Sequence, residues 1–253
     1  MKSHYLPLFS YHVKEPFDDY KRGLLVLIGE SFRSGTQGTR TRGTPESHDA
    51  QIEACKSHVK FMEYVQKQHG MNMSVYVATY DTQYTNELLD VYKDRMVGNK
   101  VFNHVVGLNN LFQHACSDVT DIHQYSCLLY VRIDLFLKDH FSTVFQPRTK
   151  MILFPCICWV LANRHNSYPR INDMMIMVPR KYYSYLPKMN ICHELWDILC
   201  TSTDLTNDDL DVMIPTYHDS DSYKDHNPMY YIVNRPETTK FHSEGHLFDK
   251  NKF

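Results

Sequence analysis

The first half of the chain alternates short apolar runs with longer segments that carry apolar residues on only one side. The apolar runs lie at residues 23–29, 73–79, 101–106 and 127–131, and none of them contains Asp, Glu, Lys or Arg. Uncharged runs of this length are typical of strands that are covered on both faces of a sheet. We therefore expect four buried strands within the first 134 residues.

The segments between these runs have the spacing of amphipathic helices. Residues 47–69 place apolar side chains on one face at steps of three and four, and Gly70 follows as a helix end. Two further helices are expected at residues 85–95 and 108–124. Strands that alternate with helices in this way predict a parallel sheet with right-handed connections.

The rhythm changes after residue 134, where we expect a short helix or turn at 135–145. The remaining expected elements are strands at 151–155, 156–161, 171–178, 212–214 and 230–233, helices at 179–186 and 193–200, and a polar loop at 202–211. No internal repeat and no linker rich in Pro or Gly divides the chain. We therefore expect one domain over residues 1–253.

Polar residues follow three of the expected strands, at residues 29–33, 79–81 and 132–134. Because open α/β sheets keep their ligand crevice at the carboxyl ends of the strands, we expect these side chains to converge there. Arg132 and Asp134 are two residues apart and point to the same side of an extended strand. An arginine suits a phosphate, and a carboxylate suits a divalent metal ion.

A loop rich in Gly, Thr and Arg follows the first strand and carries Arg33, Arg40 and Arg42. Flexible backbone, hydroxyl groups and guanidinium groups in this place suit a diphosphate. A solvated loop without a ligand is the alternative, and composition does not decide between the two. The loop is neither a Rossmann fingerprint nor a P-loop, because GxGxxG and GK[ST] are both missing from the sequence.

Composition and charge narrow the class of protein. The formal net charge is −2 and no basic run occurs, so nothing indicates nucleic-acid binding. The seven cysteines lack CxxC spacing, which favours free thiols in a reducing compartment. The first residues lack an apolar run of signal-peptide length, and no stretch approaches the roughly 20 apolar residues that span a bilayer. We therefore expect a cytoplasmic protein without a membrane span.

Four short motifs carry a resemblance to a known family. They are GESFR at 29–33, VATYDTQY at 77–84, RID at 132–134 and INDMMIMVP at 171–179. Together they resemble nucleotide-sugar glycosyltransferases of the GT-A fold. More narrowly, they resemble those of large DNA viruses that build their own capsid glycans, the chloroviruses above all. The resemblance covers residues 23–235.

The resemblance implies a GT-A-like α/β fold with a mostly parallel wound sheet, flanking helices and a smaller mixed C-terminal part. Residues 23–134 would form the nucleotide-sugar-binding half, and residues 135–253 the acceptor-facing half. The implied reaction moves a sugar from a nucleoside diphosphate to a glycan hydroxyl on a glycoprotein. UDP is our first choice of nucleotide, with xylose, glucose and galactose all open as the sugar. A viral member would modify a capsid-protein N-glycan in the cytoplasm of the infected cell.

In this family an Asp-x-Asp after a central strand binds the divalent metal, the ribose and the diphosphate. Arg132-Ile133-Asp134 stands in its place, so one carboxylate is missing. The resemblance implies Mn²⁺ or Mg²⁺ held by Asp134, whereas the positive charge of Arg132 would weaken or remove the dependence on metal. Arg33 would pair with a phosphate, and Tyr80 would stack on a base. The expected donor-binding residues are Gly29, Glu30, Ser31, Arg33, Thr79, Tyr80, Asp81, Arg132 and Asp134.

A transfer that inverts the anomeric centre also needs a carboxylate that takes the proton from the acceptor hydroxyl. Asp173 is our first candidate, because it is polar within an otherwise apolar, Met-rich segment. The alternative is that Asp173 starts the strand and pairs with Arg170. Glu194 is the second candidate, and its alternative is an exposed position near the start of a helix.

Three other groups give a weaker signal. They are the carboxylates Asp219 and Asp221 with Lys224 nearby, the histidines His242 and His246 at i, i+4 spacing, and the tryptophans Trp159 and Trp196. We favour a solvated turn for the first group, an exposed tail for the second and core positions for the third.

Two other functions stay open. A nucleotidyltransferase also uses a wound sheet and carboxylates, but it usually has a signature Lys near the first strand, where this chain has Arg33. The other is a catalytically impaired module that binds a nucleotide or carbohydrate, because the RID sequence lacks the second carboxylate.

Overall fold

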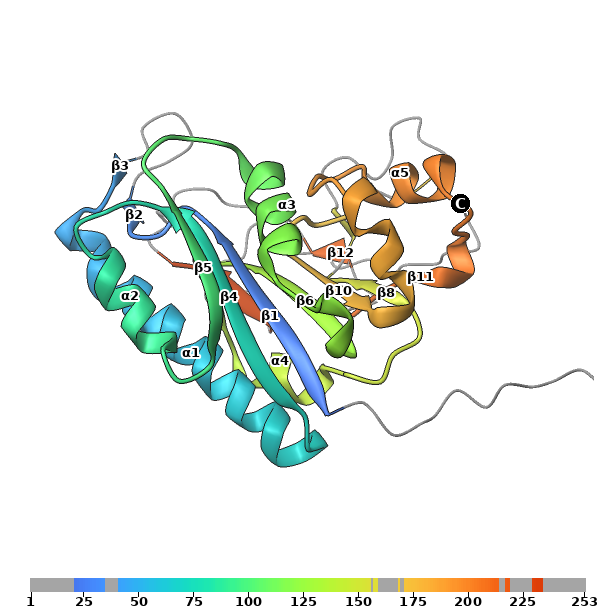
Figure 1. Ribbon diagram of the computed structural model, residues 1–253, viewed down its shortest axis with the longest axis horizontal. Helices are drawn as coiled ribbons and strands as arrows, with labels where there is room; N and C mark the ends of the chain where they lie inside the picture. The colour runs from blue at the N-terminus through green and yellow to red at the C-terminus, as the bar shows by residue number, and fades with distance from the viewer. Residues whose placement is uncertain are drawn as a thin grey trace, which may run out of the picture.

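The structure is a computed structural model, and it describes residues 21–34, 41–155, 157–158, 168, 171–213, 217–218 and 229–233. Its centre is a seven-stranded sheet with the strand order β11-β8-β10-β6-β1-β4-β5 (Figure 1). Helices cover both faces of this sheet. The expected α/β class, with a mostly parallel wound sheet and flanking helices, is therefore confirmed.

The parallel part of the sheet consists of β1 (Arg22–Gly29), β4 (Asn72–Tyr80), β5 (Met96–Phe102) and β6 (Cys127–Arg132). The chain winds outward from β1 through β4 to β5, and then crosses back to place β6 on the other side of β1. The winding direction therefore reverses between β1 and β6. Such a switch point opens a crevice at the carboxyl ends of the two strands, where ligands bind in open α/β sheets.

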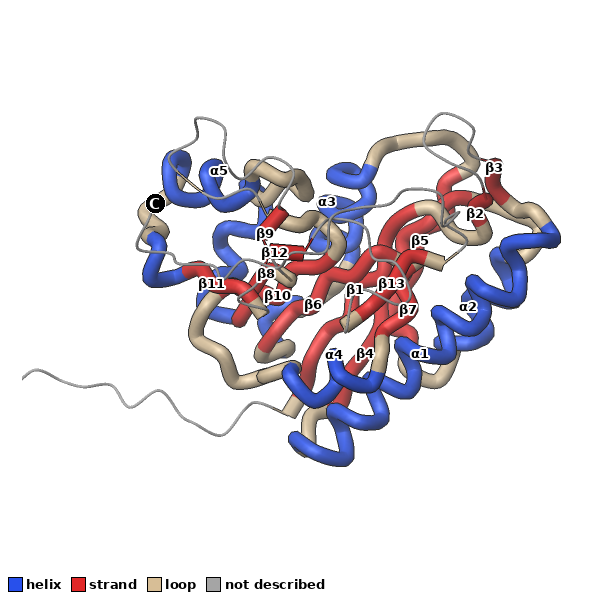
Figure 2. The backbone as a smooth tube through the Cα atoms, turned by 180° about the vertical axis from the view of Figure 1, so that it is seen from behind, coloured by secondary structure: helices blue, strands red, loops and turns tan. Residues whose placement is uncertain are grey.

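The rest of the sheet is mixed. β10 (Met175–Pro179) runs antiparallel to β6, β8 (Ile152–Phe154) runs antiparallel to β10, and β11 (Leu210–Val212) runs parallel to β8. Three two-stranded ladders accompany it: β2 (Arg33–Ser34) with β3 (Thr41–Arg42), β7 (Leu135–Leu137) with β13 (Tyr230–Ile232), and β9 (Ile157–Cys158) with β12 (Tyr217–His218). Figure 2 shows β7 and β13 on the side of the sheet that carries α1 (Pro45–His69), which β7 contacts.

β1 explains why the first apolar run is continuous. Its residues Leu24, Val26 and Ile28 belong to the core under α3 (Leu108–Asp118), and Leu25 and Leu27 belong to the core under α1 and α2 (Thr85–Tyr92). All five side chains are fully buried, because helices cover both faces of the strand (Figure 1).

The smaller helices extend these two layers. α4 (Asp139–Val144) packs with α1, and the 3-10 helix η3 (Arg180–Lys188) and α5 (Leu195–Ser202) pack on the side of α3. α1 ends where expected, at Gly70, whose φ of 66° is left-handed and whose N–H bonds to the carbonyl of Gln66. No helix among the described residues combines the length and apolarity needed to cross a membrane.

Several boundaries differ from the expected ones. The third strand is Met96–Phe102 rather than 101–106, because β5 is the edge strand and only Phe102 of its seven residues is buried, so the strand makes no apolar run. The expected helix at 108–124 ends at Asp118, and a separate 3-10 turn follows at Ile122–Gln124 after Asp121, whose φ is 55°. Residues 135–145 divide into β7 and α4.

The C-terminal half differs in detail as well. The strand expected at 171–178 is regular only from Met175, so Asp173 lies in a turn before it. The loop expected at 202–211 contains a 3-10 turn at Asn207–Asp209 and the start of β11. β13 and α5 lie close to their expected positions. Much of the strand expected at 156–161 lies outside the described residues.

Candidate functional site

A cavity of about 330 Å³ opens at the switch point of the sheet, where β1 and β6 end. The register aligns the end of β1 with the ends of β6 and β4, because Ile28 is the partner of Arg132 in β6 and Gly29 is the partner of Thr79 in β4. The residues that line the cavity are Gly29, Glu30, Arg33, Tyr80, Val105, Gly107, Leu108, Leu111, Arg132 and Asp173. Three separate expected site segments and the expected base therefore meet in one cavity.

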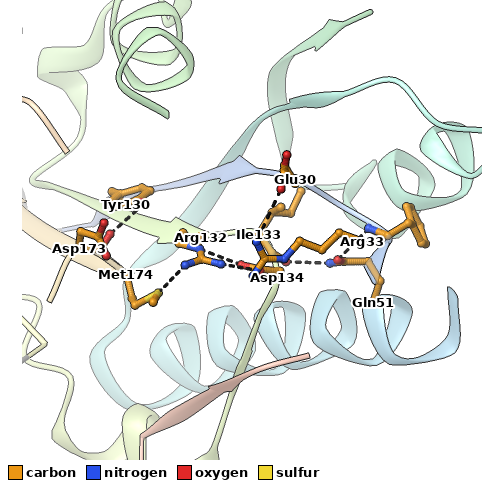
Figure 3. A network of polar contacts seen from close by, with 10 residues as sticks. Glu30, Arg33, Gln51, Tyr130, Arg132, Ile133, Asp134, Asp173 and Met174 are labelled. Atoms are coloured by element: carbon orange, nitrogen blue, oxygen red, sulfur yellow. Dashed lines mark hydrogen bonds and ion pairs between the residues drawn. The ribbon is translucent and has the colours of Figure 1, made fainter. Parts of the chain in front are cut away.

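Two arginines and one aspartate form the centre of the site, which we call the Arg–Asp–Arg cluster: Arg33, Asp134 and Arg132 (Figure 3). Arg132 donates from Nε to Oδ1 of Asp134 at 3.0 Å and from Nη2 to Oδ2 at 2.6 Å. Arg33 Nη2 lies 2.9 Å from the same Oδ2. The Asp134 side chain is only 3% exposed and does not line the cavity, so it lies behind the two guanidinium groups.

The electrostatics of the cluster keep Asp134 and Arg132 charged. Burial alone would raise the pKa of the Asp134 carboxyl, but Arg132 and Arg33 outweigh burial and hold this pKa below its ordinary value. Burial would likewise lower the pKa of Arg132, and the neighbouring Asp134 raises it instead. The three groups of the cluster therefore carry two positive charges and one negative charge, and the carboxylates of Glu30 and Asp173 line the same cavity.

Gln51 of α1 joins the two loops that carry the cluster. Its Nε2 donates to the carbonyl of Ile133 at 2.8 Å, and its Oε1 accepts from the N–H of Phe32 at 3.2 Å (Figure 3). The Gln51 side chain is fully buried. The backbone between Gly29 and Phe32 turns sharply, since Gly29 has a φ of 129° that only glycine adopts readily. Gln51 therefore fixes the loop after β1 against the end of β6.

Asp173 reaches the cavity through a turn that is held against β6. The Tyr130 hydroxyl donates to the Asp173 carbonyl at 3.1 Å, and the Arg132 N–H donates to the Met174 carbonyl at 2.9 Å. Within the turn, the Asn172 side chain accepts from the N–H of Met174 at 3.0 Å. The turn places the Asp173 carboxylate near Arg132, at the wall of the same cavity. Glu30 also lines the cavity, and its Oε2 lies 3.6 Å from Arg33 Nη1.

Tyr80 lines the cavity, but most of its ring is covered. The residue is 3% exposed, its hydroxyl accepts the N–H of Gly107 at 3.1 Å, and the Arg42 guanidinium lies 4.8 Å from the ring centroid. A base that stacked on this ring would therefore have to displace Arg42. The expected stacking of Tyr80 on a base stays a prediction.

Three other expected donor residues do not line the cavity. Ser31 and Thr79 are buried and hydrogen bond to each other at 3.0 Å, and Thr79 also donates to the Gly29 carbonyl at 2.9 Å. These hydrogen bonds hold the loop after β1 against the end of β4. Asp81 is exposed to solvent, and its N–H bonds to the Phe102 carbonyl at the end of β5.

Glu194 is half-buried at the start of α5 and is not among the residues that line the cavity. Burial raises the pKa of the Cys192 thiol, two residues before Glu194. Trp196 is a core residue, as favoured, since it is fully buried and its ring packs against Phe154 at 5.6 Å. The remaining expected groups lie outside the described residues: Arg40, Trp159, Arg170, Asp219, Asp221, Lys224, His242 and His246.

The donor atoms around Asp134 do not fit a divalent cation. Mn²⁺ and Mg²⁺ take several oxygen ligands, and both oxygens of Asp134 already accept bonds from guanidinium groups. In the part of the chain that the structure describes, no three residues of the types His, Cys, Asp or Glu come together as a metal site. The sequence-based assignment of Asp134 as a metal ligand therefore does not match the donor set around it.

Comparison with known proteins returned no matching family model and no matching curated protein. Among solved structures, a mutant of Drosophila β1,4-galactosyltransferase 7 in complex with manganese, UDP-Gal and xylobiose has a TM-score of 0.45 at 9% identity, over 88% of this chain and 77% of that one. Staphylococcus aureus TarS has a TM-score of 0.46 at 10% identity, over 84% of this chain and 60% of that one.

A glycosyltransferase involved in glycosylation of the major capsid of PBCV-1 has a TM-score of 0.35 at 8% identity, over 66% of this chain and 63% of that one. TM-scores below 0.5 at such identities do not assign a function. The function therefore rests on the geometry of the site.

Proposed function

We propose that the protein is a glycosyltransferase that moves a sugar from a nucleoside diphosphate to a hydroxyl group of a glycan. The observation that carries this proposal is the composition of the switch-point cavity. Two guanidinium groups, from Arg33 and Arg132, and the carboxylate of Asp173 line the same cavity. Cations and a carboxylate in one cavity match the two requirements of sugar transfer, a stabilised leaving group and a base.

The leaving group of this reaction is a nucleoside diphosphate, which gains negative charge as the bond to the sugar breaks. Guanidinium groups stabilise such charge well, because they donate parallel N–H bonds to phosphate oxygens and stay protonated. Arg33 and Arg132 are pre-positioned by Asp134, so little reorganisation is needed when the diphosphate binds. We assign both arginines to the diphosphate.

The acceptor hydroxyl must lose a proton when it attacks the sugar. Asp173 lines the cavity beside Arg132, whereas Glu194 does not line it, so the geometry favours Asp173 as the base of an inverting transfer. A base in this position would face the sugar from the side of β10, away from the loop after β1. Glu194 stays the second candidate for the base.

UDP is the nucleotide we propose first, and xylose, glucose and galactose are the sugars to compare. The capsid-glycan acceptor, the viral origin and the cytoplasmic location stay predictions from the sequence. The chain spans 77% of the Drosophila galactosyltransferase structure and 60% of TarS.

The direct test measures UDP release from UDP-xylose, UDP-glucose and UDP-galactose in the presence of glycan acceptors, with and without Mn²⁺. The proposal expects release from at least one donor that depends on the acceptor and falls sharply in Asp173→Asn. UDP binding without turnover on any acceptor would instead favour a module that binds nucleotide. Absence of binding to any nucleoside diphosphate would refute the proposal.

A further inference from the structure

We propose that Arg33 and Arg132 bind the diphosphate directly, without a bridging divalent cation, and that Asp134 is the positioning residue that holds both guanidinium groups in place. This inference rests on the proposed function and adds to it how the donor phosphates are recognised. Three features of the Arg–Asp–Arg cluster support it.

The first feature is the saturation of Asp134. Oδ1 accepts from Arg132 Nε, and Oδ2 accepts from both Arg132 Nη2 and Arg33 Nη2. A metal ion that bound one of these oxygens would have to displace a guanidinium group, which is positively charged like the ion itself. The displaced guanidinium groups are only 12% and 17% exposed, so they would remain close to the ion and repel it.

The second feature is what the cluster presents to the cavity. Arg33 and Arg132 line the cavity and Asp134 does not. A ligand that enters therefore meets the guanidinium N–H donors of the cluster before the Asp134 carboxylate, which lies behind them. This order suits an anion such as a diphosphate, and it is the reverse of what a metal ion needs.

The third feature is a weak partner on Arg132. Its Nη1 contacts the thioether sulfur of Met174 at 2.9 Å, and a thioether is a poor acceptor for a guanidinium N–H. A phosphate oxygen is a much stronger acceptor for this N–H, and little interaction energy is lost when the contact to the Met174 sulfur breaks. Figure 3 shows the Met174 sulfur and Asp134 on different sides of this guanidinium group.

Charged side chains of both signs face the site. Two guanidinium groups bring the same positive charge as one divalent cation, and Asp134 offsets half of it. The other acids at the cavity are Glu30, which lies beside Arg33, and Asp173, which the proposed function assigns to the acceptor proton. A bound diphosphate would accept hydrogen bonds from both guanidinium groups.

Isothermal titration of UDP into the full chain, in EDTA and in Mn²⁺, tests the inference. We expect UDP to bind in EDTA, with an affinity that changes by less than about threefold when Mn²⁺ is added, because the arginines supply the positive charge. Arg132→Lys should weaken UDP binding by about tenfold in both buffers, because lysine keeps the charge and loses the planar fork. Arg22→Lys is the matched control, since Arg22 lies at the opposite end of β1, and it should bind UDP like the unaltered chain.

Asp134→Asn separates the positioning role from a metal-ligand role. As a positioning residue, Asp134 should matter equally in EDTA and in Mn²⁺, so the loss of UDP affinity should be the same in both buffers. UDP binding that appears only with Mn²⁺, and that Asp134→Asn abolishes only there, would overturn the inference and leave the proposed function intact. UDP binding in neither buffer would overturn the proposed function itself.

Discussion

Asp134→Asn should destabilise the fold strongly, although the substitution barely changes the size of the side chain. The carboxylate accepts three N–H bonds, at 3.0, 2.6 and 2.9 Å, from two guanidinium groups that are 17% and 12% exposed. The asparagine would keep one acceptor, and its amide N–H groups would face the two cations. The two positive charges would then lie side by side without the carboxylate that they share.

Removing one partner of a buried ion pair costs about 3–5 kcal/mol. We expect the lower end, about 3 kcal/mol, because both arginines line a cavity through which water reaches them. For a chain of this size, such a loss corresponds to a decrease in Tm of about 6–12 °C. A domain of ordinary stability would still fold after this loss.

The assay is urea unfolding followed by far-UV circular dichroism, with the same m value expected for both proteins. Asp139→Asn is the matched control, because Asp139 accepts from Lys60 at 2.7 Å, yet both side chains are at least 70% exposed. The control should change the unfolding free energy by less than about 1 kcal/mol. Equal effects of the two substitutions would refute the view that Asp134 is a buried anchor for two cations.

Three further predictions follow from the same geometry. Asp173→Asn should keep UDP affinity and lower the rate of transfer by about 10²–10⁴-fold, as measured by UDP release, and a collapse of UDP binding would assign Asp173 to the donor instead. Gln51→Ala should lower the unfolding free energy by about 1–3 kcal/mol in urea, because it leaves the buried Phe32 N–H and Ile133 carbonyl without this partner, and an unchanged value would contradict that role. Burial lowers the pKa of His58 from 6.5 to about 4, so its contribution to stability is full above pH 6.5 and is lost as the pH falls toward 4. Unfolding measured across this range should show a slope that His58→Gln flattens.

The sequence was informative where a simple spatial rule applied. Arg33, Tyr80 and Arg132 were expected to meet because parallel strands end at one edge, and all three line the same cavity. The uncharged run of β1 identified a central strand, since only a strand with helices on both faces can be apolar at every position. Asp173 was singled out as a polar residue among methionines, and it also reaches the cavity.

Features that depend on partners far apart in the sequence could not be predicted in the same way. Nothing near Asp134 in the sequence indicated that Arg132 and Arg33 would both bind its carboxylate, because Arg33 lies about a hundred positions earlier. Gln51 was not singled out, although the sequence offered a signal. It is a polar residue on the same helical face as the buried Cys55 and Met62. The edge strand β5 was misplaced because exposed residues interrupt its apolar pattern.

A crystal structure of the chain with bound UDP, grown once in EDTA and once with Mn²⁺, would test the central claim most directly. We expect the diphosphate in the switch-point cavity in both crystals, with its oxygens within hydrogen-bond distance of the Arg33 and Arg132 guanidinium groups. A diphosphate that lay elsewhere on the molecule, or that reached these residues only through a metal ion on Asp134, would contradict it.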